Sequence, residues 1–221
     1  YGDHRDLHYP LRRQRQMCIR DRYRIYPITL FFVVELSNLN IKNGLCISLG
    51  ANIDSKFGSP IESLLVSKLK VEELIKEWGD QTSTKKEENR KSKPNFLWSS
   101  IYETSPHGVE NEQPNYLNTL VLVKSNYFPK PSTINAKLLL KKLKKLESFF
   151  GREKTPKGKK WLSRCLDLDI LWWDDFHTID KELILPHPRF MNRNFVITPL
   201  SEILSRSQKI KKFDDPRWSI T

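Results

Sequence analysis

The segment Cys165–Trp173, CLDLDILWW, constrains the fold of this chain more than any other stretch. Apolar and acidic residues alternate through Leu166–Ile170, and side chains two apart on a β-strand point to the same face. The pattern therefore predicts a strand that sends Asp167 and Asp169 to one face and its apolar side chains into a core.

Two carboxylates on one face repel each other unless a cation lies between them, and hard oxygen ligands of this type suit Mg²⁺ held together with substrate phosphates. Several residues suited to a polyphosphate come shortly before the pair: Arg152, Lys154, Lys160, Trp161 and Arg164. Together they predict a site where a metal and cations meet on one ligand. Taken singly, Asp-x-Asp is also typical of an edge strand with solvated aspartates, and the basic residues are also typical of a solvated loop.

Hydrophobic periodicity predicts a mixed domain that begins at Leu45. Strands are expected at 45–49, 98–103, 116–125 and 165–173, and helices at 59–78, 132–150 and, in a shorter form, 200–204. Two irregular segments, 105–114 and 186–199, are typical of functional loops. Because strands and helices are mixed rather than strictly alternating, the predicted class is α+β.

Both long helices carry end signals. Ser59-Pro60-Ile61-Glu62 has the form of a capping box with proline at the first helical position, and Gly151 stands where a C-terminal cap is favoured. After the first helix, residues 80–94 are charged and lack large apolar side chains, which predicts a solvated loop.

Residues 1–44 do not share the pattern of the rest. Six arginines crowd positions 12–24 without apolar periodicity, while Asp3, Asp6 and Asp21 are unlike a transit peptide. We expect a leader that is non-native or disordered and lies outside the fold, so that deleting residues 1–40 leaves folding and activity intact.

The formal net charge is +12, and residues 1–44 hold eight basic and four acidic residues, so the remainder keeps 30 minus 22, or +8. Much of that surplus lies between Lys137 and Arg164, where it fits a nucleotide polyphosphate as well as a nucleic acid. The three cysteines, Cys18, Cys46 and Cys165, indicate neither a disulfide framework nor a zinc site, which favours the cytoplasm. The longest apolar run is far too short to span a membrane.

Six blocks resemble the 6-hydroxymethyl-7,8-dihydropterin pyrophosphokinases and occur in that family's order. They are Ser48–Asn52, Ser99–Pro106, Gln113–Asn118, Gly151-Arg152, Arg164–Ile170 and Leu185–Arg189. The resemblance spans about Leu45 to Ile203. It implies a ferredoxin-like sandwich with a four-stranded antiparallel core sheet, in a domain over 45–221 with a charged insertion at 80–95. It also implies transfer of pyrophosphate from ATP to a pterin alcohol in folate biosynthesis, with two Mg²⁺ ions.

The resemblance assigns roles residue by residue. It implies catalysis at Arg152, Lys160, Arg164, Asp167 and Asp169, with the two aspartates as magnesium ligands. It implies ATP binding at Lys154, Trp161, Ile170, His187 and Arg193. It implies pterin binding at Thr104, Pro106, His107, Tyr116, Asn118 and Phe195.

These residue types suit the ligands. A flat pterin can stack between Tyr116 and Phe195 while Asn118 reads its edge, although each aromatic also suits a core. Lysine stands at 154 and 160 where arginine is common, which keeps the charge and loses the bidentate fork.

Two other readings stay open. A basic nucleic-acid or nucleotide-binding protein would use the charge and tryptophans but leaves the aspartate pair unexplained. A pterin-binding relative without catalysis is the other. We expect a monomer without nucleic-acid or membrane partners.

Overall fold

The computed structural model describes residues 44–82, 93–106, 112–124, 129–153 and 162–207, which belong to the unit Ile41–Thr221. The predicted leader lies outside these ranges, Gly44 excepted. In chain order the elements are β1 (Leu45–Ala51), α3 (Pro60–Thr82), β2 (Asn95–Trp98), β3 (Tyr102–Thr104), β4 (Tyr116–Lys124), α4 (Thr133–Phe149), β5 (Asp167–Trp173), β6 (Thr178–Ile179), β7 (Ile184–Leu185), the 3-10 helix η3 (Phe190–Asn192) and α5 (Asn194–Ser207). Among the described helices, none is both long and apolar enough to cross a membrane.

One antiparallel sheet organises the domain. Four strands lie in the order β2-β4-β1-β5, and β3 also pairs with β4. The strands β6 and β7 form a separate two-stranded sheet. The predicted combination of an antiparallel sheet with helices is confirmed.

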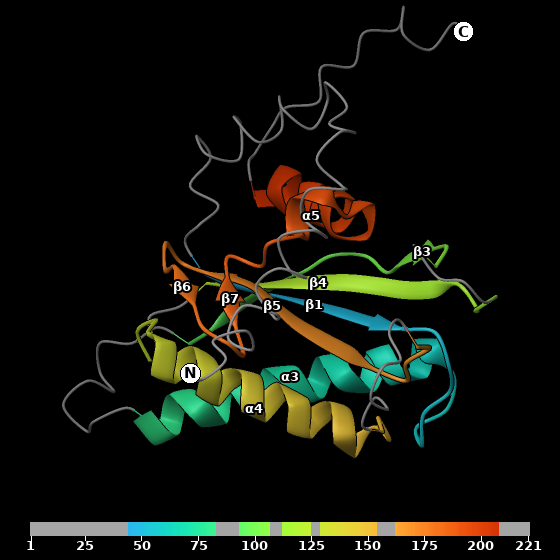
Figure 1. Ribbon diagram of the computed structural model, residues 1–221, viewed down its shortest axis with the longest axis horizontal. Coiled ribbons are helices and arrows are strands. Elements are labelled where there is room, and N and C mark those ends of the chain that lie inside the picture. The colour runs from blue at the N-terminus through green and yellow to red at the C-terminus, as the bar shows by residue number, and fades with distance from the viewer. Residues whose placement is uncertain (1–43, 83–92, 107–111, 125–128, 154–161, 208–221) are drawn as a thin grey trace, which may run out of the picture. The chain divides into compact units, whose positions relative to one another are not determined.

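Helices cover the two faces of this sheet unequally. Figure 1 shows α3 and α4 beneath the sheet and α5 above it. The core on the α3 and α4 side includes Ile47, Val121, Leu168 and Trp173, all 2% exposed or less. On the opposite face, α5 packs on β4 and β3. The part of that face formed by β1 and β5 carries the aspartate pair, so it can serve as a binding surface.

The single strand predicted at 98–103 is wrong, because the structure has two short strands there. The Ser99 Oγ accepts the Leu120 N–H at 3.0 Å, and the Ser100 N–H donates to the Glu202 carboxylate at 2.7 Å. Since Glu202 takes the Ser100 donor, the pairing with β4 is interrupted between β2 and β3.

Two helix boundaries also differ from the prediction. The helix α3 continues to Thr82, past the point where the solvated loop was expected to start, and residues 83–92 lie outside the described ranges. The last helix begins at Asn194, not near Leu200, and has Pro199 inside it. Proline removes one helical hydrogen bond, but Val196, Leu200 and Ile203 are buried on one side and offset that loss.

The ends of α4 confirm the prediction and place a site residue. Ser132 caps the helix by accepting the Asn135 N–H at 3.1 Å. At the other end Gly151 has φ +101°, its N–H donates to the Ser148 carbonyl, and the Arg152 N–H donates to the Glu147 carbonyl. These two bonds form a Schellman motif, which glycine favours at that φ. The motif turns Arg152 back toward the sheet.

Candidate active site

Strand register brings polar residues into one row across the sheet. Asn118 of β4 and Asp167 of β5 both lie opposite Gly50 of β1, and Tyr102 of β3 lies opposite Asn118. Directly opposite residues point to the same face. Asn118 and Asp167 therefore share a face with only a glycine between them, and Asp169 follows in the next row, opposite Ser48.

Gly50 occupies the middle of this row, between Asn118 and Asp167. A Cβ atom there would lie 3.0 Å from Oδ1 of Asn118 and 4.0 Å from Cδ1 of Tyr116. The first distance is shorter than ordinary van der Waals contact, so any side chain at position 50 would press on the Asn118 amide. The absence of a side chain keeps the surface open between Asn118 and Asp167.

Asp167 is held by two guanidinium groups. The Nη1 atom of Arg152 lies 2.6 Å from Oδ1, and Nη1 of Arg164 hydrogen-bonds to Oδ2. Burial works to raise the pKa of Asp167, but the charges of Arg164 and Arg152 outweigh burial and hold the pKa below its ordinary value. The carboxylate is therefore ionised at neutral pH and acts as an acceptor or ligand.

Arg152 is placed by its own helix as well as by Asp167. Its Nη1 atom also lies 2.6 Å from Oε2 of Glu147, a residue of α4 that is 1% exposed. The other carboxylate oxygen of Glu147 accepts the Leu168 N–H at 2.8 Å and so links α4 to the start of β5. Glu147 therefore fixes the distance between Arg152 and the aspartate strand.

Arg164 is placed by Asn52, which is 2% exposed and follows β1. Its Oδ1 atom accepts the Arg164 N–H at 2.6 Å, and its Nδ2 atom donates to the Pro114 carbonyl at 3.1 Å and to Ser163 Oγ at 3.2 Å. One buried amide thus joins the end of β1, the segment before β4 and the segment before β5.

Asp169 stands in a second, looser group. The Nη1 atom of Arg193 lies 4.0 Å from its Oδ2 atom, and the same guanidinium stacks 5.3 Å from the Phe195 ring centroid. The His187 N–H donates to the Leu171 carbonyl at 2.7 Å, which places His187 beside β5. Asp169 has the more accessible carboxylate of the pair, with its side chain 34% exposed against 22% for Asp167.

His187 has a defined tautomer in its neutral form. Its Nδ1 atom accepts the Arg189 N–H at 3.2 Å, so the proton of the neutral ring is on Nε2. Burial lowers the pKa of His187, and the charges of Arg193 and Arg189 lower it as well. The charge of Asp169 acts to raise the pKa but does not cancel these effects. Near neutral pH this ring therefore offers an Nε2–H donor to a ligand.

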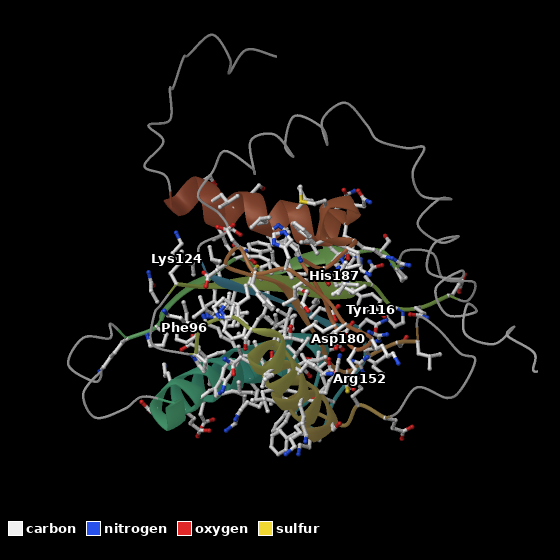
Figure 2. The ribbon with its side chains drawn as sticks, turned by 60° about the vertical axis from the view of Figure 1, so that its left-hand side comes forward. Phe96, Tyr116, Lys124, Arg152, Asp180 and His187 are labelled. Carbon is white, nitrogen blue, oxygen red and sulfur yellow. The ribbon has the colours of Figure 1, made fainter. Side chains whose placement is uncertain are left out.

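Three of the residues expected to hold the pterin, Thr104, Tyr116 and Asn118, lie on β3 and β4 at the other end of the row, whereas Phe195 lies beside Arg193 in the Asp169 group. Asn118 Nδ2 donates to Thr104 Oγ1 at 2.8 Å and to the Tyr116 carbonyl at 3.4 Å, and Pro106 follows two residues after Thr104. Burial raises the pKa of Tyr116, and Arg164, Asp167 and Arg152 lie close enough to affect it. Figure 2 shows Tyr116 and Arg152 away from Phe96 and Lys124 at the other end of the sheet.

Not every expected residue comes together. Ile170 has the opposite strand parity from the aspartates and is 2% exposed in the core, so its side chain does not face the site. Four expected residues, His107, Lys154, Lys160 and Trp161, lie outside the described ranges.

Sequence reasoning missed the supporting residues. Glu147 falls on the apolar stripe of α4, between Leu143, Leu146 and Phe150, and a carboxylate in that stripe was the available signal. Asn52 stood in a quoted block without a role. Its three partners are distant in sequence, so periodicity could not reveal them.

The donor set fits magnesium. Asp167 and Asp169 supply hard oxygens from one face, and within the described residues no cluster of three or more His, Cys, Asp or Glu could hold a metal. Mg²⁺ is usually bound by one or two carboxylates, with substrate phosphates and water completing its octahedron. Two aspartates beside several arginine side chains match that requirement.

Comparison with known proteins identifies the family. The model of the 7,8-dihydro-6-hydroxymethylpterin-pyrophosphokinase family matches residues 46–205. The chain belongs to this pyrophosphokinase family. The expectation drawn from the six sequence blocks is thereby confirmed.

Curated relatives of the pyrophosphokinase family agree with this assignment. A 2-amino-4-hydroxy-6-hydroxymethyldihydropteridine pyrophosphokinase of Bacillus subtilis is 37% identical over 111 residues, covering 50% of this chain and 60% of that protein. One of the same name from Aquifex aeolicus is 37% identical over 105 residues, covering 48% and 59%. A folate synthesis bifunctional protein of Arabidopsis thaliana is 31% identical over 158 residues, covering 72% of this chain and 26% of that protein. The matches thus span about 60% of the bacterial relatives' length.

Proposed function

We propose that this protein transfers a pyrophosphoryl group from ATP to the hydroxyl of 6-hydroxymethyl-7,8-dihydropterin, a step of folate biosynthesis. The pterin hydroxyl loses its proton to solvent and its oxygen forms a bond to the β-phosphorus, while the bond from that phosphorus to the α,β-bridging oxygen breaks and AMP leaves with the bridging oxygen. The observation that carries the proposal is the row Asn118–Gly50–Asp167, which runs from a polar ring-binding end to a cationic, carboxylate-bearing end without a side chain in between.

The cationic end suits the triphosphate. Reactions of this class depend mainly on positioning and charge neutralisation. Arg152 and Arg164 meet at Asp167, and His187 and Arg193 border Asp169, so four donors surround the pair. Bound Mg²⁺, two ions in the proposal, supplies additional neutralisation of the phosphate charge. Lys154, Lys160 and Trp161 are proposed to contact the nucleotide as well.

The ring-binding end suits the pterin. We propose that Tyr116 and Phe195 stack on the two faces of the ring, with Thr104, Pro106 and His107 beside it. Because Asn118 Nδ2 is already bonded to Thr104, the orientation of this amide is set before a ligand arrives. A preset orientation reduces the entropy lost on binding.

The fold proposal follows from element order. The sequence β1-α3-β2-β4-α4-β5 has the βαββαβ form of ferredoxin-like domains, with β3 as an addition beside β4. We propose that these elements form the predicted ferredoxin-like sandwich. A cytoplasmic location and a monomeric state stay predictions.

The direct test is release of AMP from ATP in the presence of the pterin alcohol and Mg²⁺, followed by a coupled assay. The proposal requires that AMP release depend on the pterin. ATP consumption that is independent of the pterin, or salt-sensitive binding of oligonucleotides without AMP release, would instead favour the nucleotide- or nucleic-acid-binding reading.

Replacing the aromatic walls should weaken pterin binding selectively. Tyr116→Ala and Phe195→Ala each remove one stacking surface, worth roughly 0.5–1.5 kcal/mol beyond area burial. Isothermal titration calorimetry should show lower pterin affinity with little change for an ATP analogue. Tyr116→Phe, which keeps the ring and loses only long hydroxyl contacts of 3.3 and 3.5 Å, is the matched control. Unchanged pterin affinity in both alanine variants would remove these rings from the site.

Gly50→Ala tests whether the absence of a side chain at position 50 is needed for pterin binding. The added methyl group would press on Asn118 Oδ1 from 3.0 Å, and moving this amide disturbs its bond to Thr104. We expect about a tenfold loss of pterin affinity, equivalent to about 1.4 kcal/mol, with ATP-analogue affinity within about twofold. Equal loss for both ligands would show that the substitution distorts β1 as a whole.

A further inference from the structure

Glu147 is a buried carboxylate with three partners. Its Oε1 atom accepts the Leu168 N–H at 2.8 Å and lies 2.8 Å from Lys144 Nζ, while Oε2 lies 2.6 Å from Arg152 Nη1. Burial raises the pKa of Glu147, and the charge of Lys144 and that of Arg152 act against the increase. A carboxylate in such a place is stable only while cations compensate its charge.

Arg152 is shared between two acids. The same Nη1 atom that binds Glu147 also lies 2.6 Å from Asp167 Oδ1. In the proposed reaction this guanidinium has to face phosphate oxygens. Because one nitrogen, Nη1, serves both acids, a movement of the guanidinium toward phosphate weakens its hold on Glu147. The free energy lost when Arg152 releases Glu147 depends on whether a second cation still neutralises this carboxylate.

Lys144 is that second cation. It lies one turn before Glu147 on α4, and its side chain is 43% exposed while that of Glu147 is 2% exposed. The amine therefore reaches from the surface to the buried Glu147 carboxylate. This ion pair can persist whether or not a nucleotide is bound. Its charge also acts to lower the pKa of Asp167.

We propose that Lys144 is a positioning residue that keeps Glu147 neutralised when Arg152 turns to the nucleotide phosphates. The inference rests on the proposed function and extends it to a lysine outside the set of site residues that the sequence predicted. Without Lys144, Arg152 is the remaining cation on Glu147 among its described partners, and nucleotide binding has to break that pair.

The test is calorimetric titration of the full chain with a non-hydrolysable ATP analogue and Mg²⁺. Lys144→Gln should weaken binding at least about fivefold, whereas Lys144→Arg, which keeps the charge, should stay within about twofold. Lys145→Gln is the matched control, because Lys145 is exposed on the same helix and should also stay within twofold. Melting temperatures of the variants verify that they are folded.

A double variant separates an indirect from a direct role. If Lys144 acts through Glu147, then Lys144→Gln should change analogue affinity by less than about twofold when it is introduced into the Glu147→Gln variant, because no buried charge remains for Lys144 to neutralise. If Lys144 contacts the phosphates itself, Lys144→Gln costs the same factor with Glu147 and with Gln at position 147, and the inference is overturned. Should Glu147→Gln prevent folding, Glu147→Met takes its place, since apolar replacements of buried ions are often tolerated.

The outcomes also separate this inference from the proposed function. Normal analogue binding by Lys144→Gln, with normal binding and AMP release by the unmodified protein, overturns the role of Lys144 alone. Failure of the unmodified protein to bind the analogue and release AMP overturns both.

Discussion

Replacing Asp167 or Asp169 by asparagine should abolish most AMP release and leave the fold intact. Each substitution removes a proposed magnesium ligand and, with it, a negative charge from the proposed triphosphate site. Losing one electrostatic contact of this kind typically costs about 10²–10³ in rate. The strand itself should persist, because Leu168 and Ile170 are 0% and 2% exposed and anchor it from the other face.

The two variants should differ in stability. Asp167→Asn leaves Arg152 and Arg164 without their shared acceptor, whereas Asp169→Asn loses only a contact of 4.0 Å to Arg193. The pKa of Asp167 is lowered in the folded state, so its stabilisation is present above the unfolded-state value of about 3.9 and is lost as pH falls through the lower folded value. Asp167→Asn should therefore lower the melting temperature at pH 7. Its melting temperature should also decrease less than that of the unmodified protein when the pH is lowered.

Steady-state AMP release at several Mg²⁺ concentrations measures the catalytic part of this prediction. Raising Mg²⁺ should partly restore the rate of each variant. Asp80→Asn, an exposed residue of α3, is the control for the loss of one negative charge. Near-normal rates for both site variants at low Mg²⁺ would exclude the metal role and, with it, the core of the proposed function.

Arg152→Ala is expected to reduce both activity and stability. The substitution removes a cation that is proposed to bind phosphate and leaves the buried Glu147 carboxylate with Lys144 and the Leu168 N–H. A lost charged hydrogen bond of this kind costs about 1.5–3 kcal/mol of unfolding free energy. We expect a rate loss of roughly 10²-fold or more, by analogy with other lost electrostatic contacts.

Arg152→Lys separates the two effects. Lysine keeps the charge but loses the planar fork that lets one guanidinium bridge Glu147 and Asp167. Its unfolding free energy, from urea titration, should lie between those of the alanine variant and the unmodified protein, while AMP release stays strongly reduced. A stable Arg152→Ala protein with normal AMP release would show that the bridge serves neither purpose.

Local pattern was sufficient for several elements. The alternation in Leu166–Ile170 predicted β5 and the shared face of its aspartates. Periodicity predicted the extent of α4, and Gly151 predicted its C-terminal cap. These features depend on period, steric limits and caps, which act over a few residues. The family blocks then indicated the reaction class.

Other features were beyond local pattern. The break after Ser99 depends on the Glu202 carboxylate, which is 102 residues from Ser100, and the start of α5 at Asn194 depends on burial of its apolar side against the sheet. In both cases a tertiary contact outweighs a local preference. Neither contact has a periodic signature.

The sequence by itself determined which residue types were available and which strand carries the two carboxylates. Only the tertiary structure decided their partners: register set Gly50 between Asn118 and Asp167, and Asn52 and Glu147 oriented the two arginines. The physical reason is the distance along the chain over which each effect acts. Propensity and periodicity act between neighbours in the chain, whereas a buried charge or amide is stable only where distant segments supply its partners.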